Sequence, residues 1–111
     1  MVTRAGYDGA SVSLRAPIAV PVEIRAPKRR VFRLTAAVGE DGVRLARGAP
    51  FEPGRPVEVR FDLPDGLGAL ALPALVGEGD GADDQLAFVN PPADAREVIR
   101  RYVHGRLGLP T

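Results

Sequence analysis

The chain of 111 residues contains no cysteine and no tryptophan, and His104 is its only histidine. The lack of cysteine excludes disulfide frameworks, thiolate nucleophiles and thiolate metal sites. A single histidine without thiolate partners is a poor basis for a metal centre, so we expect no metal and no cofactor. The 15 basic and 14 acidic residues give a net charge of +1, which indicates neither a nucleic-acid binder nor an acidic tail.

Long apolar runs and catalytic motifs are also missing. The most apolar segment, residues 67–76, is shorter than the roughly 20 residues of a membrane span, and Pro73 interrupts it. The first ten residues lack the apolar stretch of an export signal, so we expect a cytoplasmic protein without membrane insertion. The sequence has no nucleophile elbow, no P-loop and no paired carboxylates on rigid elements, and we therefore predict no enzymatic activity.

Alternating apolar and polar residues make up most of the chain. This period of two is typical of a strand with one buried face, and Gly- and Pro-rich turns separate the segments. In the second segment the alternation puts Phe32, Leu34, Ala36 and Val38 on one face. Six strands at this spacing predict a sandwich or a small barrel. The expected strands lie at residues 18–25, 32–38, 43–45, 57–63, 70–76 and 85–89.

The C-terminal segment has the period of a helix instead. Its apolar residues, which would share one helix face, are Ala95, Val98, Ile99, Tyr102 and Val103. Residues 90–92 are suited to begin such a helix, and a glycine at 105 or 108 is suited to end it. We expect the apolar face to pack on the open end of the strand layer. Residues 1–111 are predicted to form one domain, with residues 1–12 as a flexible lead-in.

Three phrases carry a resemblance to a known family: "APIAVPVEIR", "VRLARGAPFEPGRPVEVRFDLPDG" and "LAFVNPPADAREVIRRYV". In this order, with the strand rhythm between them, the chain resembles the PilZ family from residue 13 to residue 106. The resemblance implies an all-β fold, a six-stranded antiparallel PilZ-type β-barrel with a C-terminal α-helix. It also implies a non-catalytic signalling module of a bacterial cytoplasm.

The resemblance also points to two motifs, an RxxxR and a (D/N)xSxxG, which together hold cyclic di-GMP in typical members. The strand pattern aligns the first motif with Ser11 and Arg15, so only its second arginine is present. It aligns the second motif with Ala37, Gly39 and Gly42, so only the final glycine is present. On this alignment the chain is a degenerate member in which the usual cyclic di-GMP binding is lost, with Arg15 and Gly42 as residual site residues.

A second RxxxR occurs in the phrase "RRVFR", at Arg29 to Arg33. It follows the first strand and lies too close to the second motif, so we interpret it as a decoy. Arg29, Arg30 and Arg33 form either a basic patch for a phosphate or an acidic partner, or a solvated strand end. A cyclic di-GMP receptor that uses Arg15 together with this arginine cluster is the alternative hypothesis.

Phe51 lies between two prolines in a Gly- and Pro-rich loop. An exposed aromatic residue at such a place is a candidate anchor for a partner protein, together with Arg29, although the ring also has the option of packing against the barrel rim. The sequence therefore favours a module that acts mainly by protein–protein interaction, with a protein partner in a bacterial signalling or motility system.

Overall fold

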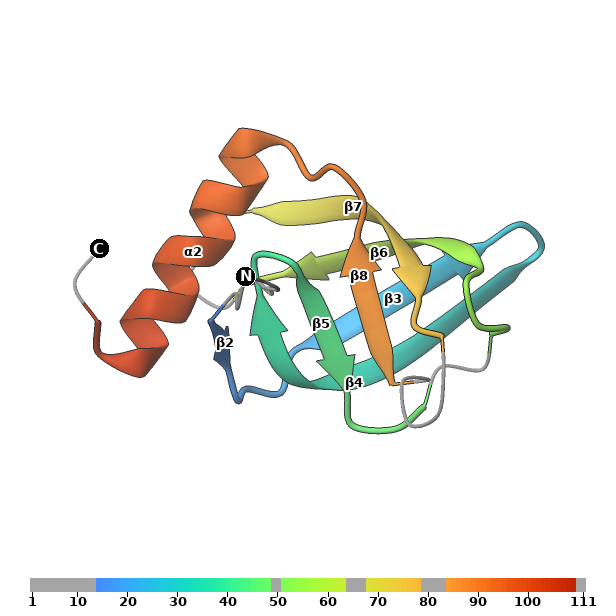
Figure 1. Cartoon of the computed structure of the whole chain (residues 1–111), viewed down its shortest axis with the longest axis horizontal. Coiled ribbons are helices and arrows are strands. Elements are labelled where there is room, and N and C mark those ends of the chain that lie inside the picture. The colour runs from blue at the N-terminus through green and yellow to red at the C-terminus, as the bar shows by residue number, and fades with distance from the viewer. Residues whose placement is uncertain (1–13, 49–50, 64–67, 79–83, 110–111) are drawn as a thin grey trace, which may run out of the picture.

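The computed structural model describes residues 14–48, 51–63, 68–78 and 84–109, and the expected lead-in over residues 1–12 lies outside these ranges (Figure 1). The strands are β2 (Arg15–Ala16), β3 (Pro21–Ala26), β4 (Arg29–Gly39), β5 (Gly42–Leu45), β6 (Pro56–Asp62), β7 (Ala69–Val76) and β8 (Gln85–Phe88). One helix, α2 (Ala93–Leu107), follows them.

Six of these strands close into a barrel in which all neighbours are antiparallel. The order around the barrel is β4-β3-β6-β7-β8-β5, and β5 returns to pair with β4. The short β2 lies outside this ring and pairs with the end of β4, with Arg15 opposite Gly39. The structure confirms the expected six-stranded antiparallel barrel with a C-terminal helix and decides between the barrel and the sandwich.

The central strand β6 follows the sequence pattern closely. Val57, Val59 and Phe61 are 6%, 0% and 5% exposed and point into the barrel, while the charged residues between them point outward. Burial of each such side chain contributes about 1.5–3 kcal/mol to folding. The inward residues of β3, β5, β7 and β8 complete the same core.

In the first half of β4, the face that the sequence pattern predicted to be buried points outward, and the other face points into the barrel. Phe32 and Leu34 are 66% and 52% exposed, whereas Thr35 is 1% exposed. The register explains this, because directly opposed residues share one face of a sheet. Val22 points into the barrel, and its partner on β4 is Arg33 rather than Phe32.

A β-bulge restores the predicted phase farther along β4. The pairing of β4 with β5 shifts between Thr35 and Ala37, which leaves Ala36 as an extra residue. An extra residue inverts the side-chain alternation because that alternation has a period of two. Thr35 therefore points inward before the bulge and Val38 points inward after it, at 0% exposure. The predicted single apolar face from Phe32 to Val38 is wrong.

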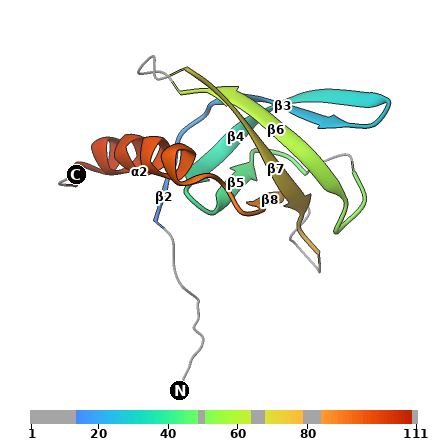
Figure 2. The same ribbon diagram turned by 90° about the horizontal axis from the view of Figure 1, so that it is seen from above.

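The helix α2 agrees with its prediction. Ala95, Ile99, Tyr102 and Val103 are buried, and the helix ends at Gly108, whose left-handed backbone (φ 73°) suits a glycine. α2 packs beside β2 and the end of β4, at one end of the barrel (Figure 2). Within the described residues, no helix is long and apolar enough to cross a membrane.

Candidate functional site

The turn between β4 and β5 carries the residues that align with the second motif. Gly39 and Gly42 face each other across this turn, and Arg15 of β2 is the partner of Gly39 on the other edge of β4. The carbonyl oxygen of Asp41 accepts a hydrogen bond of 2.9 Å from the amide of Phe88. The structure thus brings together Arg15 and Gly42, the two candidate residues that the motif alignment retained.

Gly42 is required by the barrel itself. A Cβ atom at this position would lie 2.2 Å from the carbonyl oxygen of Leu86 on β8. Its φ of 156° is also a backbone conformation that other residues rarely adopt. The close approach of β5 and β8 therefore accounts for this glycine without any ligand.

Arg15 makes two polar contacts within the chain. Its Nε donates to Oδ1 of Asp41 at 3.2 Å, and its Nη1 donates to Oε1 of Gln85 at 2.8 Å. The Arg15 side chain is 26% exposed and that of Asp41 is 48% exposed. A side chain of the second-motif turn and one at the start of β8 thus hold the guanidinium group.

The surroundings of Gly39 leave no room for a side chain in this arrangement. A Cβ atom would lie 2.7 Å from Cγ of Arg15 and 2.7 Å from the carbonyl oxygen of Leu14. Real Cβ contacts are longer than this, and Leu14 contributes a backbone atom that cannot rotate away. The position of Arg15 against β4 thus depends on the absence of a side chain at residue 39.

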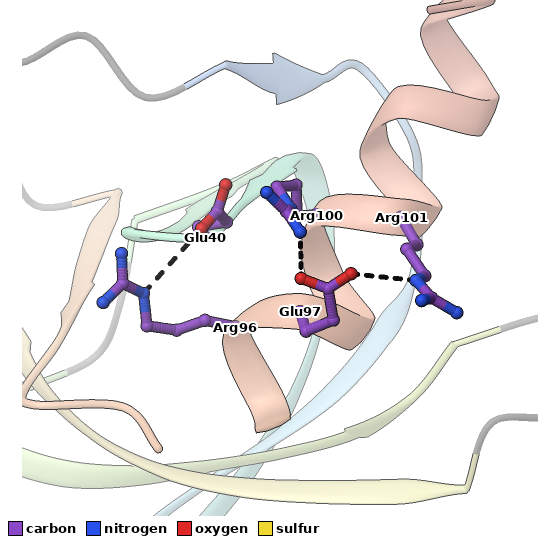
Figure 3. A network of polar contacts seen from close by, with 5 residues as sticks. All are labelled: Glu40, Arg96, Glu97, Arg100 and Arg101. Atoms are coloured by element: carbon purple, nitrogen blue, oxygen red, sulfur yellow. Dashed lines mark hydrogen bonds and ion pairs between the residues drawn. The ribbon is translucent and has the colours of Figure 1, made fainter. Parts of the chain in front are cut away.

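The other acidic residue of the turn also has a cationic partner. Oε1 of Glu40 lies 3.8 Å from Nε of Arg96, in the first turn of α2 (Figure 3). The turn therefore presents two carboxylates, from Glu40 and Asp41, and each faces one arginine from another element.

Glu97 lies next along α2 and contacts two arginines of the same helix. It accepts hydrogen bonds from Arg101, at 2.9 Å, and from Arg100 (Figure 3). The hydrogen bond from Arg101 and the positive charge of Arg100 lower the pKa of Glu97 below its usual value. These pairs lie on the exposed surface of the helix and stabilise it locally.

The second RxxxR lies at the other end of β4 from Arg15. At roughly 3.3 Å per residue, β4 extends about 33 Å from Arg29 to Gly39 and about 20 Å from Arg33 to Gly39. The tip of the β3–β4 hairpin, beside Arg29, is at the opposite end of the barrel from β2 (Figure 1). The structure does not bring Arg29, Arg30 and Arg33 together with Arg15.

The cluster also splits across the two faces of β4. Arg30 points outward, where its Nε lies 3.5 Å from Oε2 of Glu23. Arg33 belongs to the inward-facing set, and its Nη1 donates to the carbonyl oxygen of Phe32 at 3.0 Å. Arg33 thus lies apart from Arg30, whereas Arg29 and Arg30 line one hollow with Arg25 and Lys28 at the tip of the β3–β4 hairpin.

The sequence left open whether Phe51 is an exposed anchor or packs against the barrel, and the structure shows that it packs against the barrel. It is 8% exposed and belongs to the hydrophobic core, so it is not an exposed aromatic anchor. The guanidinium carbon of Arg29 lies 4.9 Å from the centre of the Phe51 ring, which is the geometry of a cation–π contact. Arg29 thus covers the ring from outside.

Thr35 is a structural residue that the sequence pattern did not reveal. Its Oγ1 accepts a hydrogen bond of 2.8 Å from the amide of Val20 and donates one of 2.7 Å to the carbonyl oxygen of Ile18. These bonds fasten the segment that joins β2 to β3. Because β2 holds Arg15, Thr35 helps to position the site.

Comparisons with solved structures place this architecture among known folds. The inhibitor of motility MotI/DgrA of Bacillus subtilis matches with a TM-score of 0.67 and 17% identity, over 86% of this chain and 50% of that chain. The PilZ domain of CeSA from a cellulose-synthesizing bacterium matches with a TM-score of 0.64 and 22% identity, over 84% of this chain and 97% of that chain. The present chain thus spans half the length of the Bacillus subtilis protein. Among curated proteins, none matches the sequence.

A family model matches most of the sequence. The model of the PilZ domain matches residues 12–105, a range that includes Arg15, the Gly39–Gly42 turn and most of α2. PilZ domains are non-catalytic binding modules of cyclic di-GMP signalling. From its sequence match, and in agreement with its barrel and C-terminal helix, the chain belongs to the PilZ domain family.

Proposed function

We propose that this PilZ domain is a signalling module that acts mainly by protein–protein interaction and has lost the family's usual binding of cyclic di-GMP. The observation that carries the proposal is the engagement of Arg15, whose guanidinium group contacts Asp41 at 3.2 Å and Gln85 at 2.8 Å. A nucleotide that needs this arginine has to break both contacts first.

Electrostatics at the turn support the same conclusion. Cyclic di-GMP carries two phosphates, which arginine recognises through forked, charge-assisted hydrogen bonds. Here the carboxylate of Asp41 lies beside Arg15 and that of Glu40 lies beside Arg96, so each carboxylate offsets the charge of one arginine near the turn. A phosphate that approaches Arg15 would meet a carboxylate of like charge.

The missing anchors also weaken any nucleotide site. Ala37 and Gly39 offer no side-chain hydrogen bond where the family pattern has Asp or Asn and then Ser. The first arginine of the RxxxR motif is replaced by Ser11 on our alignment. A charge-assisted hydrogen bond contributes about 1.5–3 kcal/mol, so the loss of several such bonds lowers affinity by several orders of magnitude.

The arginines of the second RxxxR do not supply a replacement at the same place. Arg30 faces Glu23, and Arg29 stacks on Phe51. Both lie tens of ångströms along β4 from the Arg15 turn. A receptor that combines Arg15 with this cluster therefore lacks the convergence that one small ligand requires.

The setting that we propose is bacterial motility or a related signalling system, with a protein as the partner. The structural likeness to an inhibitor of motility is in keeping with this setting. We take Arg29 as part of the partner-binding surface, because its side chain covers Phe51 from the outside of the barrel.

Thermal unfolding in the presence of nucleotide tests the proposal and separates it from its alternative. A ligand that binds only the folded state raises the melting temperature. We expect no rise with cyclic di-GMP for the wild-type chain, for Arg15→Ala or for a variant with Arg29, Arg30 and Arg33 changed to Gln. GMP serves as the control for weak, unspecific phosphate binding.

A saturable rise in the wild-type chain would contradict the proposal. If Arg15→Ala alone abolished it, the family's usual site would be intact despite its changed motif. If the Gln variant also abolished it, the receptor that uses both arginine groups would be the correct function.

A further inference from the structure

Two large apolar side chains stand next to each other on the outside of the barrel. Phe32 and Leu34 are 66% and 52% exposed, and Pro21, the cross-strand partner of Leu34, is exposed beside them. We call Pro21, Phe32 and Leu34 the outer apolar strip. The β-bulge at Ala36 lets the odd-numbered residues of this half of β4 face the interior, so the strip faces solvent. Contiguous exposed apolar surface of this kind is typical of an interaction site.

The strip separates two hollows in the surface. One has a volume of about 380 Å³ and lies along Phe32, Leu34 and Ala46. The other has a volume of about 570 Å³ and lies between Phe32 and Leu70. Pro21 and Phe32 line both hollows, so the ring of Phe32 forms part of the ridge between them. Hollows of this size on either side of an aromatic ring suit the side chains of a partner segment.

The charges around the smaller hollow favour an acidic partner. Among the residues that the structure describes, the charged ones that line it are Arg33 and Arg47. Nε of Arg33 is buried without a hydrogen-bond partner, and Arg47 has no ion pair among the described residues. The guanidinium group of Arg30 lies 5.9 Å from the centre of the Phe32 ring and pairs with Glu23, which lines the larger hollow. Arginine side chains beside an apolar hollow favour a carboxylate ligand, because the two groups form charge-assisted hydrogen bonds.

We propose that the outer apolar strip, with Arg33 and Arg47, docks a partner-protein segment in which an apolar side chain is flanked by carboxylates. The apolar side chain packs against Phe32 and Leu34, and a carboxylate binds Arg47 at the smaller hollow. This inference rests on the protein partner of the proposed function, but it uses a surface separate from the Arg15 turn. Phe32 therefore takes the role of exposed aromatic anchor that the sequence suggested for Phe51.

Selection from a library of random displayed peptides tests the chemistry without a known partner. The folded wild-type chain is the bait, and a chain with both Phe32→Ser and Leu34→Ser is used for counter-selection. We expect the enriched peptides to combine an apolar residue with Asp or Glu. Binding of a selected peptide should weaken about tenfold or more in Phe32→Ser and in Arg47→Glu, because each change removes a central contact.

Leu75→Ser is the matched control, because Leu75 is another exposed apolar strand residue, at 41% exposure, and lines neither hollow. This variant should bind the selected peptide as the wild-type chain does. Unchanged melting temperatures of the strip variants would show that they remain folded, as expected for side chains that are already exposed.

Three outcomes would overturn the inference: no enrichment over the counter-selected chain, enrichment of basic peptides, or equal loss of binding in Leu75→Ser. Self-association of the wild-type chain that Phe32→Ser abolishes would identify a second copy as the occupant instead. These outcomes do not depend on cyclic di-GMP, so a failure here is distinguishable from a failure of the proposed function.

Discussion

Nε of Arg15 and Oδ1 of Asp41 lie 3.2 Å apart, which joins the edge strand β2 to the turn that carries the second PilZ motif. In the family pattern, both elements contribute to one ligand site. Here they contact each other, and Gln85 takes a second hydrogen bond from the same guanidinium group. Arg15 thus has one charged and one neutral partner within the chain.

The contact between Arg15 and Asp41 should contribute little to the free energy of unfolding, because both side chains are partly exposed. We expect Arg15→Ala and Asp41→Ala each to lower the free energy of unfolding by about 1 kcal/mol or less. Their coupling energy in a double-mutant cycle, measured by urea denaturation, should lie within the same range. A coupling of several kcal/mol would mean that the pair is a principal support of the fold.

Introduction of serine at position 39, where our alignment with the family motif expects one, should destabilise the chain. The new Cβ atom would lie 2.7 Å from both Arg15 and the backbone of Leu14. We expect Gly39→Ser to lower the free energy of unfolding by about 1–3 kcal/mol through overpacking. Gly105→Ser is the control, because a Cβ atom there meets open space. Equal stability of the two variants in denaturant titrations would contradict this account of the turn.

Removal of the Thr35 hydroxyl should loosen the segment between β2 and β3. Thr35→Val keeps the shape of the side chain but leaves the amide of Val20 and the carbonyl of Ile18 without their bonds to Oγ1. We expect a loss of about 1–3 kcal/mol in the free energy of unfolding. Thr35→Ser retains the hydroxyl and should recover most of that loss. A higher free energy of unfolding for Thr35→Val than for Thr35→Ser would contradict this role of the hydroxyl.

Stability should depend on pH through Glu97, whose pKa is lowered by Arg101 and Arg100. A carboxyl group with a lower pKa in the folded state stabilises that state above the pKa of the unfolded chain and loses this effect as pH falls through the folded value. The wild-type chain should therefore melt at a higher temperature than Glu97→Gln at neutral pH. The difference should shrink as the pH falls below the usual glutamate value of 4.5. A difference that stays constant down to acidic pH would contradict this assignment.

Much of the fold was predictable because most strands bury one face. In β6 the valines and Phe61 alternate with charged residues, and nothing in the pairing disturbs that pattern. The apolar face of α2 was predictable for the same reason at the helical period. The inverted first half of β4 was not predictable, because which side chains point inward depends on the pairing with β3 and on the extra residue at Ala36.

The candidate site could be located from the sequence only in part. The resemblance to the family placed Arg15 and Gly42 at one site, and in the structure both pair with Gly39, Arg15 from β2 and Gly42 from β5. The partners of Arg15 could not be anticipated, because Asp41 and Gln85 are 26 and 70 residues away along the chain. The burial of Phe51 likewise involves residues distant in sequence, among them Arg29, which makes a cation–π contact with its ring.

The most direct test of the central claim is isothermal titration calorimetry of the wild-type chain with cyclic di-GMP. The account predicts no saturable heat up to concentrations of about 100 μM, where the family's arrangement of two motifs would have bound. Saturable heat with one defined stoichiometry, lost in Arg15→Ala, would contradict it. That result would mean that the nucleotide displaces Asp41 and Gln85 from Arg15, and that the contacts seen here are a resting state of a working receptor.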